Sequence, residues 1–567
     1  MYGRADFPML NKTQSHLREL IESCLSQLSP SPQDRLAVEV EIPSDRRHGE
    51  FATNIALKSA KIFRQAPMAI AEKMLPLINA AIRQGPLAQK IERVDIKAPG
   101  FINFYLSREA LYDVLHEIFS KKESYGASSV GAGTRVQLEF VSANPTGPLS
   151  VAHARQAAVG DALGNILKFL GFDAVKEFYV NDEGNQINLL GESVRLQAQK
   201  LLTGEDPDGP LPYQGEYLID IARDFLKDHR IADANQLKEH VAQGRVRDYA
   251  VAYLMKIIKK ELDDFGVHFD VWSHQSQIAA PAQVAALLEA FKKQGHCYEK
   301  DGAWWFRSTT WGDDKDRVVK KSDGTYTYLA PDIAYHKNKY DRGFTKLINL
   351  WGPDHHGYIP RIKAAASALG HDPDSLVVLI VQLATISREG KPVSMSTRKG
   401  QYIQLREVID EVGPDAARFF FLMRHLNVHL DFDLELAKKE SPENPVYYIQ
   451  YAHARIHSIF TKAQEVSVKA ETATFDRLVE AEEMTLLKTL GYFPDILNIC
   501  YQELDPYALV SYLMTLATDF HKFYDRHRVV DPAEPDLSAQ RLGLIEAVRI
   551  TLANGLGLLG VSRPQKM

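Results

Sequence analysis

Two segments of this 567-residue chain combine residue types that can bind phosphate. In the first, Val136, Leu138 and Phe140 alternate with polar residues, which predicts a strand. A turn rich in proline and glycine follows, and Ala154–Leu170 predicts a helix that ends at Gly171. Such a unit points a helix N-terminus, with free N–H groups and the positive end of the helix dipole, at whatever binds beyond the strand.

His153 falls in the first turn of this predicted helix, where the helix dipole disfavours the imidazolium form. A neutral imidazole at this point could hydrogen-bond a phosphate. The alternative is a plain turn in which the hydroxyl of Ser150 caps the helix.

The second segment, Ser394–Gly400, is a basic loop that ends at a glycine and carries Ser396, Arg398 and Lys399. Clustered hydroxyls and cations suit a mobile lid that neutralises the charge of a triphosphate as the charge develops. Taken alone, a loop of this kind is more often a solvated turn.

Three zones of the sequence could position these segments. Residues 1–120 predict a small N-terminal α/β domain. Its predicted elements are a helix over Ser15–Leu28, a strand over Leu36–Val40, a helix over Ile55–Phe63, and a turn and strand over Pro99–Tyr105.

The second zone, residues 121–435, starts with a linker at Gly126–Gly133 and then alternates strands and helices. This alternation is typical of a Rossmann-like, doubly wound parallel sheet. Within the zone, the apolar run Leu376–Val381 predicts a buried parallel strand, and charged helical segments near 190–300 predict an insertion. Residues 436–567 repeat apolar positions at helical spacing and predict an all-helical domain.

Composition narrows the class of protein. The chain is 45% hydrophobic and 25% charged, as globular domains are, and its net charge of −6 gives no overall basic signal, although a local basic stripe would be enough to bind nucleic acid. Cys24, Cys297 and Cys500 form no C-x-x-C pair, which disfavours a cysteine-rich zinc site or a disulfide framework. No apolar run approaches the roughly 18 residues of a membrane span, and Asp6 and Pro8 interrupt any signal peptide. We therefore expect a soluble, cytoplasmic protein.

Together, the two phosphate-binding segments resemble the paired motifs of the class I aminoacyl-tRNA synthetases, His-Ile-Gly-His and Lys-Met-Ser-Lys-Ser. Further segments, in the same order along the chain, are similar to the arginyl-tRNA synthetases of bacterial type. They are Gly49–Asn54, Glu139–Pro148, Tyr179–Gln186, Gly312–Arg317, Trp351–Gly357 and Asn444–Arg455. The resemblance implies that the N-terminal domain contacts tRNA, that the sheet is catalytic and that the helical domain binds the anticodon.

Both motifs depart from the family pattern. Ser150 replaces the first histidine of the first motif and Ala152 its glycine, while Ser394 and Thr397 replace the two lysines of the second. The Ser150 hydroxyl can donate to a phosphate but cannot become cationic, whereas the loop keeps positive charge next to Thr397. We expect the enzyme to tolerate these changes; the alternative is an enzyme with weak or lost activation chemistry.

The resemblance also assigns the arginine-binding residues. It places Glu139, Tyr328 and Asp332 around the guanidinium, which carboxylates bind best in fork geometry, and Ser142 and Asn144 at the α-amino and carboxylate end. The proline before Asp332 can open a helix at its first position, which would put Asp332 in the first turn. The alternative is that Asp332 only complements the helix dipole.

For the nucleotide, the resemblance implies that Ser150 and His153 contact the phosphates of ATP and that Ser396, Arg398 and Lys399 follow the departing pyrophosphate. The other ATP-binding residues would be Pro148, Ala152, Asp354, His355 and Met395. ATP would enter with Mg²⁺. No tightly bound metal is expected, because the adjacent His355 and His356 lack a third ligand.

For tRNA, the resemblance places Tyr524 on an anticodon base, with Arg528 nearby, although Tyr524 also fits a buried helical stripe. The implied reaction activates L-arginine with ATP to arginyl-adenylate and transfers it to the 2′-hydroxyl of the terminal adenosine of tRNA(Arg). We expect a monomer whose partners are tRNA(Arg), L-arginine and ATP, without a membrane. Two alternatives stay open: a tRNA-binding relative that no longer catalyses, and a nucleotidyltransferase that activates another acid.

Overall fold

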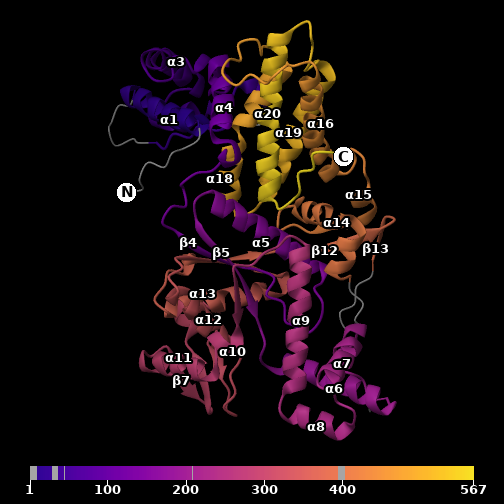
Figure 1. Cartoon of the computed structure of the whole chain (residues 1–567). Helices are drawn as coiled ribbons and strands as arrows, with labels where there is room; N and C mark the ends of the chain where they lie inside the picture. The colour runs from indigo at the N-terminus through magenta and orange to yellow at the C-terminus, as the bar shows by residue number, and fades with distance from the viewer. Residues whose placement is uncertain (1–8, 29–35, 44, 207–208, 394–402) are drawn as a thin grey trace.

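The structure is a computed structural model that describes residues 9–28, 36–43, 45–206, 209–393 and 403–567. The molecule is elongated. The N-terminal and C-terminal helices lie together at one end, the parallel sheet lies in the middle, and helices from the middle of the sequence form the other end (Figure 1).

The N-terminal unit is a three-stranded antiparallel sheet, in the order β1-β3-β2, with helices packed on it. Its elements are α1 (Met9–Leu28), β1 (Phe51–Thr53), α2 (Ile55–Phe63), α3 (Pro67–Gln84), β2 (Ile91–Lys97), β3 (Phe101–Leu106) and α4 (Arg108–Lys121). Both helices predicted for this zone and its last strand are confirmed.

The predicted strand over Leu36–Val40 is wrong. These residues have no regular secondary structure, and only Glu41 beside them forms an isolated bridge, with Ala52. Val38 and Val40 are nevertheless buried. The alternation in the sequence therefore reflects burial of every second side chain against the core, without the pairing that defines a strand.

Five parallel strands form the central sheet, in the order β11-β10-β4-β5-β6. Their bounds are β4 (Arg135–Glu139), β5 (Asp173–Val180), β6 (Val271–His274), β10 (Lys346–Trp351) and β11 (Leu376–Ile380). The chain runs outward from β4 to β6 and returns to the other side of β4 for β10 and β11, which confirms the Rossmann-like fold. The carboxyl ends of β4 and β10 meet at the switch point, where sheets of this type bind ligands.

Helices α5 (Val151–Phe169), α12 (Leu329–Asp341) and α13 (Ile359–Ala368) contact this sheet, and α14 (Leu405–Leu422) packs against α5. Helix α5 approaches the sheet closely because Gly160 faces it; a Cβ at this position would lie 2.3 Å from the ring of Phe140. The apolar run at β11 is a parallel strand as predicted. It is an edge strand, however, and residues 377–380 are only partly buried.

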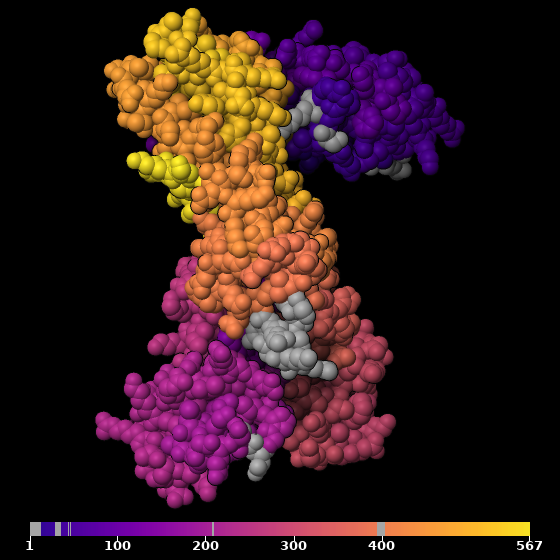
Figure 2. Space-filling view, turned by 90° about the vertical axis from the view of Figure 1, so that its right-hand side faces the viewer, coloured from indigo at the N-terminus to yellow at the C-terminus, as the bar shows by residue number. Residues whose placement is uncertain are grey.

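Between β5 and β6, four helices with a core of their own extend from the sheet. They are α6 (Asn185–Thr203), α7 (Glu216–Asp228), α8 (Ala234–Ala242) and α9 (Arg245–Asp264). A second excursion follows β6, with α10 (Gln275–Ile278), α11 (Pro281–Lys293), β7 (Cys297–Lys300), β8 (Ala303–Phe306) and β9 (Arg317–Lys320). Figure 2 shows the two excursions on opposite sides of one end of the molecule.

The range predicted as one insertion, near 190–300, thus also contains a strand of the main sheet, β6. This strand has only four residues, and only Ser273 is buried. A strand this short and this polar gives no distinct periodic signal.

The C-terminal part is helical, as predicted, and begins after a small sheet of β12 (Ala384–Arg388), β13 (Lys391–Pro392) and β14 (Leu430–Asp433). Its helices are α15 (Leu434–Lys438), α16 (Pro445–Glu465), α17 (Ala481–Gly491), α18 (Phe493–Glu503), α19 (Tyr507–Arg526) and α20 (Pro535–Leu558). In the part of the chain that the structure describes, no helix is both long and apolar enough to cross a membrane.

A buried ionic network joins the helical part to the sheet. The Asp161 carboxylate on α5 lies 2.6 Å from Lys176 Nζ of β5 and 2.6 Å from the Arg418 guanidinium of α14. Arg418 also donates to the carbonyl of Leu559, at the end of α20, at 2.9 Å. Because the charges are paired and hydrogen-bonded, they can remain away from water at the junction.

Candidate active site

The segment after β4 has an unusual backbone. Val141 and Ser142 have φ values of 67° and 39°, in the left-handed region that non-glycine residues rarely adopt. Such residues cost on the order of 1–3 kcal/mol each and persist where the surrounding structure holds them. Here the turn brings the Ser142 hydroxyl back to donate to Glu139 Oε1 at 3.0 Å, and the Ser142 hydroxyl oxygen in turn accepts the backbone N–H of Tyr179 at 3.1 Å.

Asp332 lies in the first turn of α12, as predicted. The helix begins two residues earlier than expected, at Leu329, so Pro331 occupies its third position and not its first. The hydroxyl of Tyr358 donates to Asp332 Oδ2 at 2.6 Å. Burial raises the pKa of Asp332 to about 6; the Tyr358 hydrogen bond opposes this rise, and the negative charge of Glu139 adds to it.

Glu139 is paired with a lysine that lies 200 residues further along the chain. Lys339, which is fully buried, donates from Nζ to Glu139 Oε2 at 2.5 Å and to the side-chain oxygen of Asn349 at 3.0 Å. The same ammonium group lies 4.3 Å from the ring centre of Tyr335. The charge of Glu139 is therefore compensated by a direct ion pair. Asp332 forms no ion pair with a described residue; it accepts the Tyr358 hydroxyl, and the charge of Lys339 acts on it from further away.

Behind these groups lies a second buried carboxylate, Glu177, at 0% exposed area. It accepts hydrogen bonds from the Arg342 guanidinium at 2.8 Å and from the Tyr335 hydroxyl at 2.9 Å. The ring of Tyr335 in turn stacks on that of Tyr179 at 4.4 Å. The end of the sheet thus presents aromatic rings next to carboxylates, which suits a flat, delocalised cation.

Two other residues predicted to bind arginine, Tyr328 and Asn144, do not point at the Glu139 and Asp332 carboxylates in this structure. Tyr328 is the residue before α12 and its side chain is 69% exposed, so in this structure the ring does not enclose the carboxylates. Asn144 donates from its side-chain amide to Gln186 at 2.7 Å, across to the start of α6.

At the start of α5, Ser150 is the N-cap residue and forms a capping box with His153. The backbone N–H of Ser150 donates to His153 Nδ1 at 3.2 Å, which leaves the ring proton on Nε2 as a donor. Burial lowers the pKa of His153 to about 4, so the ring is neutral at pH 7. The neutral form agrees with expectation, but its main cause is burial and not the helix dipole.

Four residues predicted for the second motif, Met395, Ser396, Arg398 and Lys399, lie outside the described residues. The next described residues begin at Ile403. The carbonyl of Ile403 accepts the N–H of Val151 at 3.2 Å, and the N–H of Leu405 donates to the carbonyl of Leu149 at 2.8 Å. The backbone that follows the second motif is therefore hydrogen-bonded to the backbone at the first motif.

The predicted nucleotide contacts after β10 lie on the short helix Pro353–Tyr358 at the switch point. The side chains of Asp354 and His355 are 78% and 60% exposed and lie 3.5 Å apart. Pro148 and Ala152, on the other side of the switch point, are partly buried. Among the described residues, no group of three or more His, Cys, Asp and Glu side chains could hold a metal ion.

On the helical domain, Tyr524 is partly buried. The Arg455 guanidinium lies 4.7 Å from its ring centre, and the ring of Phe520 stacks on it at 6.2 Å. Arg528 is exposed and donates to the carbonyl of Val530 at 3.1 Å. Part of the Tyr524 ring therefore serves packing, as the alternative of a buried stripe predicts.

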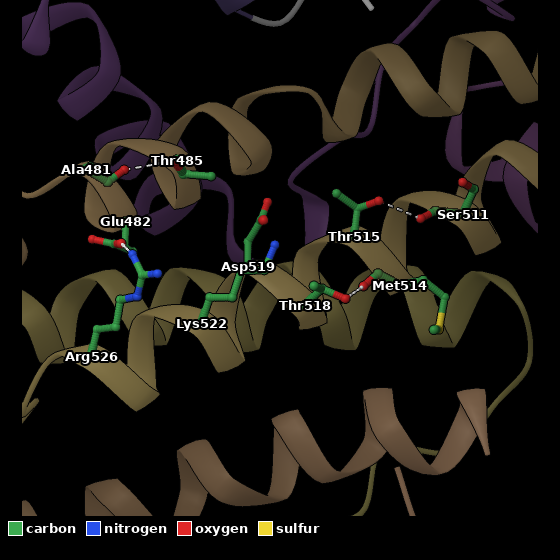
Figure 3. A pocket seen from close by; sticks show the side chains of 10 residues that line it. All are labelled: Ala481, Glu482, Thr485, Ser511, Met514, Thr515, Thr518, Asp519, Lys522 and Arg526. Carbon is green, nitrogen blue, oxygen red and sulfur yellow. Dashed lines mark hydrogen bonds and ion pairs between the residues drawn. The ribbon is translucent and has the colours of Figure 1, made fainter. Parts of the chain in front are cut away.

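The helical domain also has a groove of 720 Å³ between α17 and α19 (Figure 3). It lies at the end of the molecule that holds the terminal helices, away from the central sheet (Figure 1). Its threonine hydroxyls donate to carbonyls of their own helices, as those of Thr485, Thr515 and Thr518 do, and Arg526 pairs with Glu482. Since these hydroxyls and this ion pair already have partners within the two helices, we assign the groove no ligand.

Sequence reasoning missed Lys339 and Tyr358. Lys339 had a signal, because it follows Asp332 by seven residues, which is two helical turns and hence the same face of α12. Tyr358 had none, since it reaches Asp332 from a separate element that follows β10.

Comparison with known families gives three matches along the chain. Residues 15–106 match the arginyl tRNA synthetase N terminal domain, residues 114–423 match the catalytic domain of class I (R) tRNA synthetases, and residues 449–567 match the DALR anticodon binding domain. The chain belongs to the arginyl-tRNA synthetases.

Relatives of this family cover almost the whole chain. The arginine–tRNA ligase of Bacillus subtilis is 44% identical over 97% of the chain and 98% of its own length, and that of Desulfosudis oleivorans is 46% identical over 94% and 95%. The structure of a putative arginyl tRNA synthetase from Campylobacter jejuni has a TM-score of 0.74 at 34% identity, with 82% of this chain and 100% of that one covered. The Thermus thermophilus arginyl-tRNA synthetase, at 21% identity, TM-score 0.73 and coverage of 98% and 100%, shares the fold.

Proposed function

We propose that this arginyl-tRNA synthetase activates L-arginine with ATP and transfers it to tRNA(Arg), with the site at the carboxyl ends of β4 and β10. The observation that carries the proposal is the arrangement of Asp332, a carboxylate that forms no ion pair within the described part of the chain, beside Glu139 and the tyrosine rings. This arrangement suits the binding of one guanidinium group. Ser142 and Asn144 would hold the α-amino and carboxylate end, and Tyr328 would contact the guanidinium once its exposed ring turns toward the pocket.

In the first step, the arginine carboxylate attacks the α-phosphorus of ATP in line, and pyrophosphate leaves. In the second, the terminal 2′-hydroxyl of tRNA attacks the carbonyl of arginyl-adenylate and AMP leaves. The enzyme supplies no nucleophile, so its residues act by positioning the reactants and stabilising charge.

The N-terminus of α5 and the Nε2–H of His153 would donate to the ATP phosphates, together with the Ser150 hydroxyl. Ser396, Arg398 and Lys399 would contact the departing pyrophosphate. Pro148, Ala152, Asp354, His355 and Met395 would bind the nucleotide. ATP would enter as its Mg²⁺ complex, and the magnesium ion would neutralise phosphate charge.

For tRNA, we assign the contacts to the two terminal domains, with limits at 1–120 and 436–567 around a catalytic domain of 121–435. Tyr524 and Arg528 would meet the anticodon loop, where the exposed part of the tyrosine ring can stack on a base. We further propose that the enzyme acts as a monomer in the cytoplasm.

Arginine-dependent ATP–pyrophosphate exchange tests the proposal, measured with and without tRNA(Arg). We expect exchange only when both arginine and tRNA are present. Tight tRNA binding without exchange would favour a relative that has lost catalysis, which the changed motif residues Ser150 and Thr397 motivate. Exchange with another amino acid would favour a different substrate.

A further inference from the structure

The pocket at the end of the sheet contains three carboxylates with different partners. Glu139 is paired with Lys339 at 2.5 Å, and Glu177 with Arg342 at 2.8 Å. Among the described residues, Asp332 has no ion pair, and its hydrogen-bond donor is the hydroxyl of Tyr358 at 2.6 Å. Two of the three negative charges are thus compensated within the protein.

One uncompensated carboxylate matches one guanidinium. If Glu139 lacked its lysine, the pocket would carry a second free charge, and like charges close together disfavour ionisation of both. The value of Asp332 for recognition therefore depends on two conditions: it must be ionised, and its second oxygen must point at the ligand.

The Tyr358 hydroxyl meets both conditions. It occupies Oδ2 and so fixes the rotation of the carboxylate, which leaves Oδ1 as the oxygen that, among the described residues, accepts no hydrogen bond. A hydrogen bond to the charged form also favours ionisation, against the burial of Asp332 and the charge of Glu139. Tyr358 is itself partly buried, and the Arg361 guanidinium lies 5.4 Å from its ring centre.

We infer that Tyr358 is a positioning residue for arginine recognition, whose hydroxyl orients Asp332, the pocket carboxylate that forms no ion pair with a described residue. The inference rests on the proposed function, because it takes arginine as the ligand. The titratable and charged groups that act on Asp332 come from β4, β5, α12 and the short helix after β10; they are Glu139, Tyr179, Lys339 and Tyr358. Arg361, on α13, acts on Tyr358.

The test compares Tyr358→Phe with the wild-type chain by calorimetric titration of arginine, with tRNA(Arg) present, between pH 5 and pH 8. We expect the Kd for arginine at pH 7 to rise about tenfold, because a hydrogen bond to a charged group is lost. The pH at which binding weakens on acidification should also rise, by about one unit. Tyr340→Phe is the matched control. Tyr340 lies on α12, and its hydroxyl is 2.8 Å from the Ser375 hydroxyl. Its removal should change neither the Kd for arginine nor the pH at which binding weakens.

A merely structural role for Tyr358 would lower the thermal midpoint and weaken binding equally at every pH, which would overturn the inference. Unchanged affinity would overturn it as well. A second variant guards against misfolding: Tyr358→3-fluorotyrosine keeps the shape of the ring but donates a stronger hydrogen bond, so the acid limb should move to lower pH. No movement, or movement to higher pH, contradicts the inference.

The calorimetric titration of arginine, together with the pyrophosphate exchange assay, distinguishes a failure of this inference from a failure of the proposed function. If the wild-type chain binds arginine with the expected pH dependence but gives no pyrophosphate exchange, the proposed function fails and the role of Tyr358 stands. If exchange is normal and Tyr358→Phe leaves the pH dependence unchanged, the role of Tyr358 fails alone.

Discussion

The substitution Asp332→Asn removes the uncompensated charge of the pocket and keeps the size of the side chain. Asparagine would also turn an N–H₂ group toward the guanidinium, which has donors only. The Tyr358 hydroxyl can still donate to the amide oxygen, so the local packing is preserved. We therefore expect the substitution to act on recognition far more than on folding.

The size of the effect follows from the lost charge-assisted hydrogen bonds, which contribute about 2–4 kcal/mol in a partly desolvated site. At about 1.4 kcal/mol per factor of ten, this predicts a rise of about 30- to 700-fold in the KM for arginine. The thermal midpoint should stay level or increase, because burial disfavours the charged form of Asp332 in the folded protein.

The assay is arginine-dependent pyrophosphate exchange with tRNA(Arg), run from pH 5 to pH 8 and repeated with citrulline, which replaces the guanidinium with a neutral group of similar shape. In the wild type, a folded-state pKa of about 6 means that arginine recognition is complete above this pH and is lost as the pH falls through it. Asp332→Asn should lose this acid limb and most of its preference for arginine. A variant that keeps the wild-type KM for arginine would refute the assignment of Asp332.

Three further substitutions test other parts of the site. His153→Ala should lower the rate of exchange about 10²- to 10³-fold, and the wild-type profile should show no histidine limb above pH 5, because burial lowers the pKa of His153 to about 4. Lys339→Met should destabilise the fold by about 3–5 kcal/mol in urea denaturation by leaving Glu139 buried and uncompensated, and Glu139→Gln in the same chain should restore part of that loss. Tyr524→Ala should weaken tRNA binding by about 1–3 kcal/mol in a filter or fluorescence assay without changing the KM for arginine; an unchanged affinity for tRNA would assign Tyr524 to packing alone.

The local elements of the site were predictable from sequence because neighbouring residues determine them. The strand before the turn, the helix after it and the position of Asp332 in a first helical turn all follow from periodicity and capping residues, although α5 begins at Val151, three residues before the predicted start. The same logic failed at Leu36–Val40, where the side chains alternate in burial without a partner strand.

The pairings of the site were not predictable in this way. Lys339 meets Glu139 across 200 residues, and Tyr358 meets Asp332 from another element, so both contacts depend on the order of strands in the sheet. For Tyr328, the sequence predicted the position in the chain but not the direction of the side chain. The residue directly precedes α12, yet its ring is mostly exposed. Which way a side chain turns at the end of a helix depends on packing that no short motif records.

The ionic network around Asp161 has a consequence for how the enzyme handles tRNA. Rotating the helical domain relative to the sheet would pull the carbonyl of Leu559 away from Arg418 and the carbonyl of Leu558 away from Asn165, and would leave the buried Arg418 guanidinium with fewer hydrogen-bond partners. The distance between the anticodon-binding helices and the carboxyl end of the sheet is thus held constant. A fixed distance of this kind selects RNA by its length. An RNA can contact the anticodon-binding helices and the carboxyl end of the sheet at the same time only if its two ends are separated by that distance.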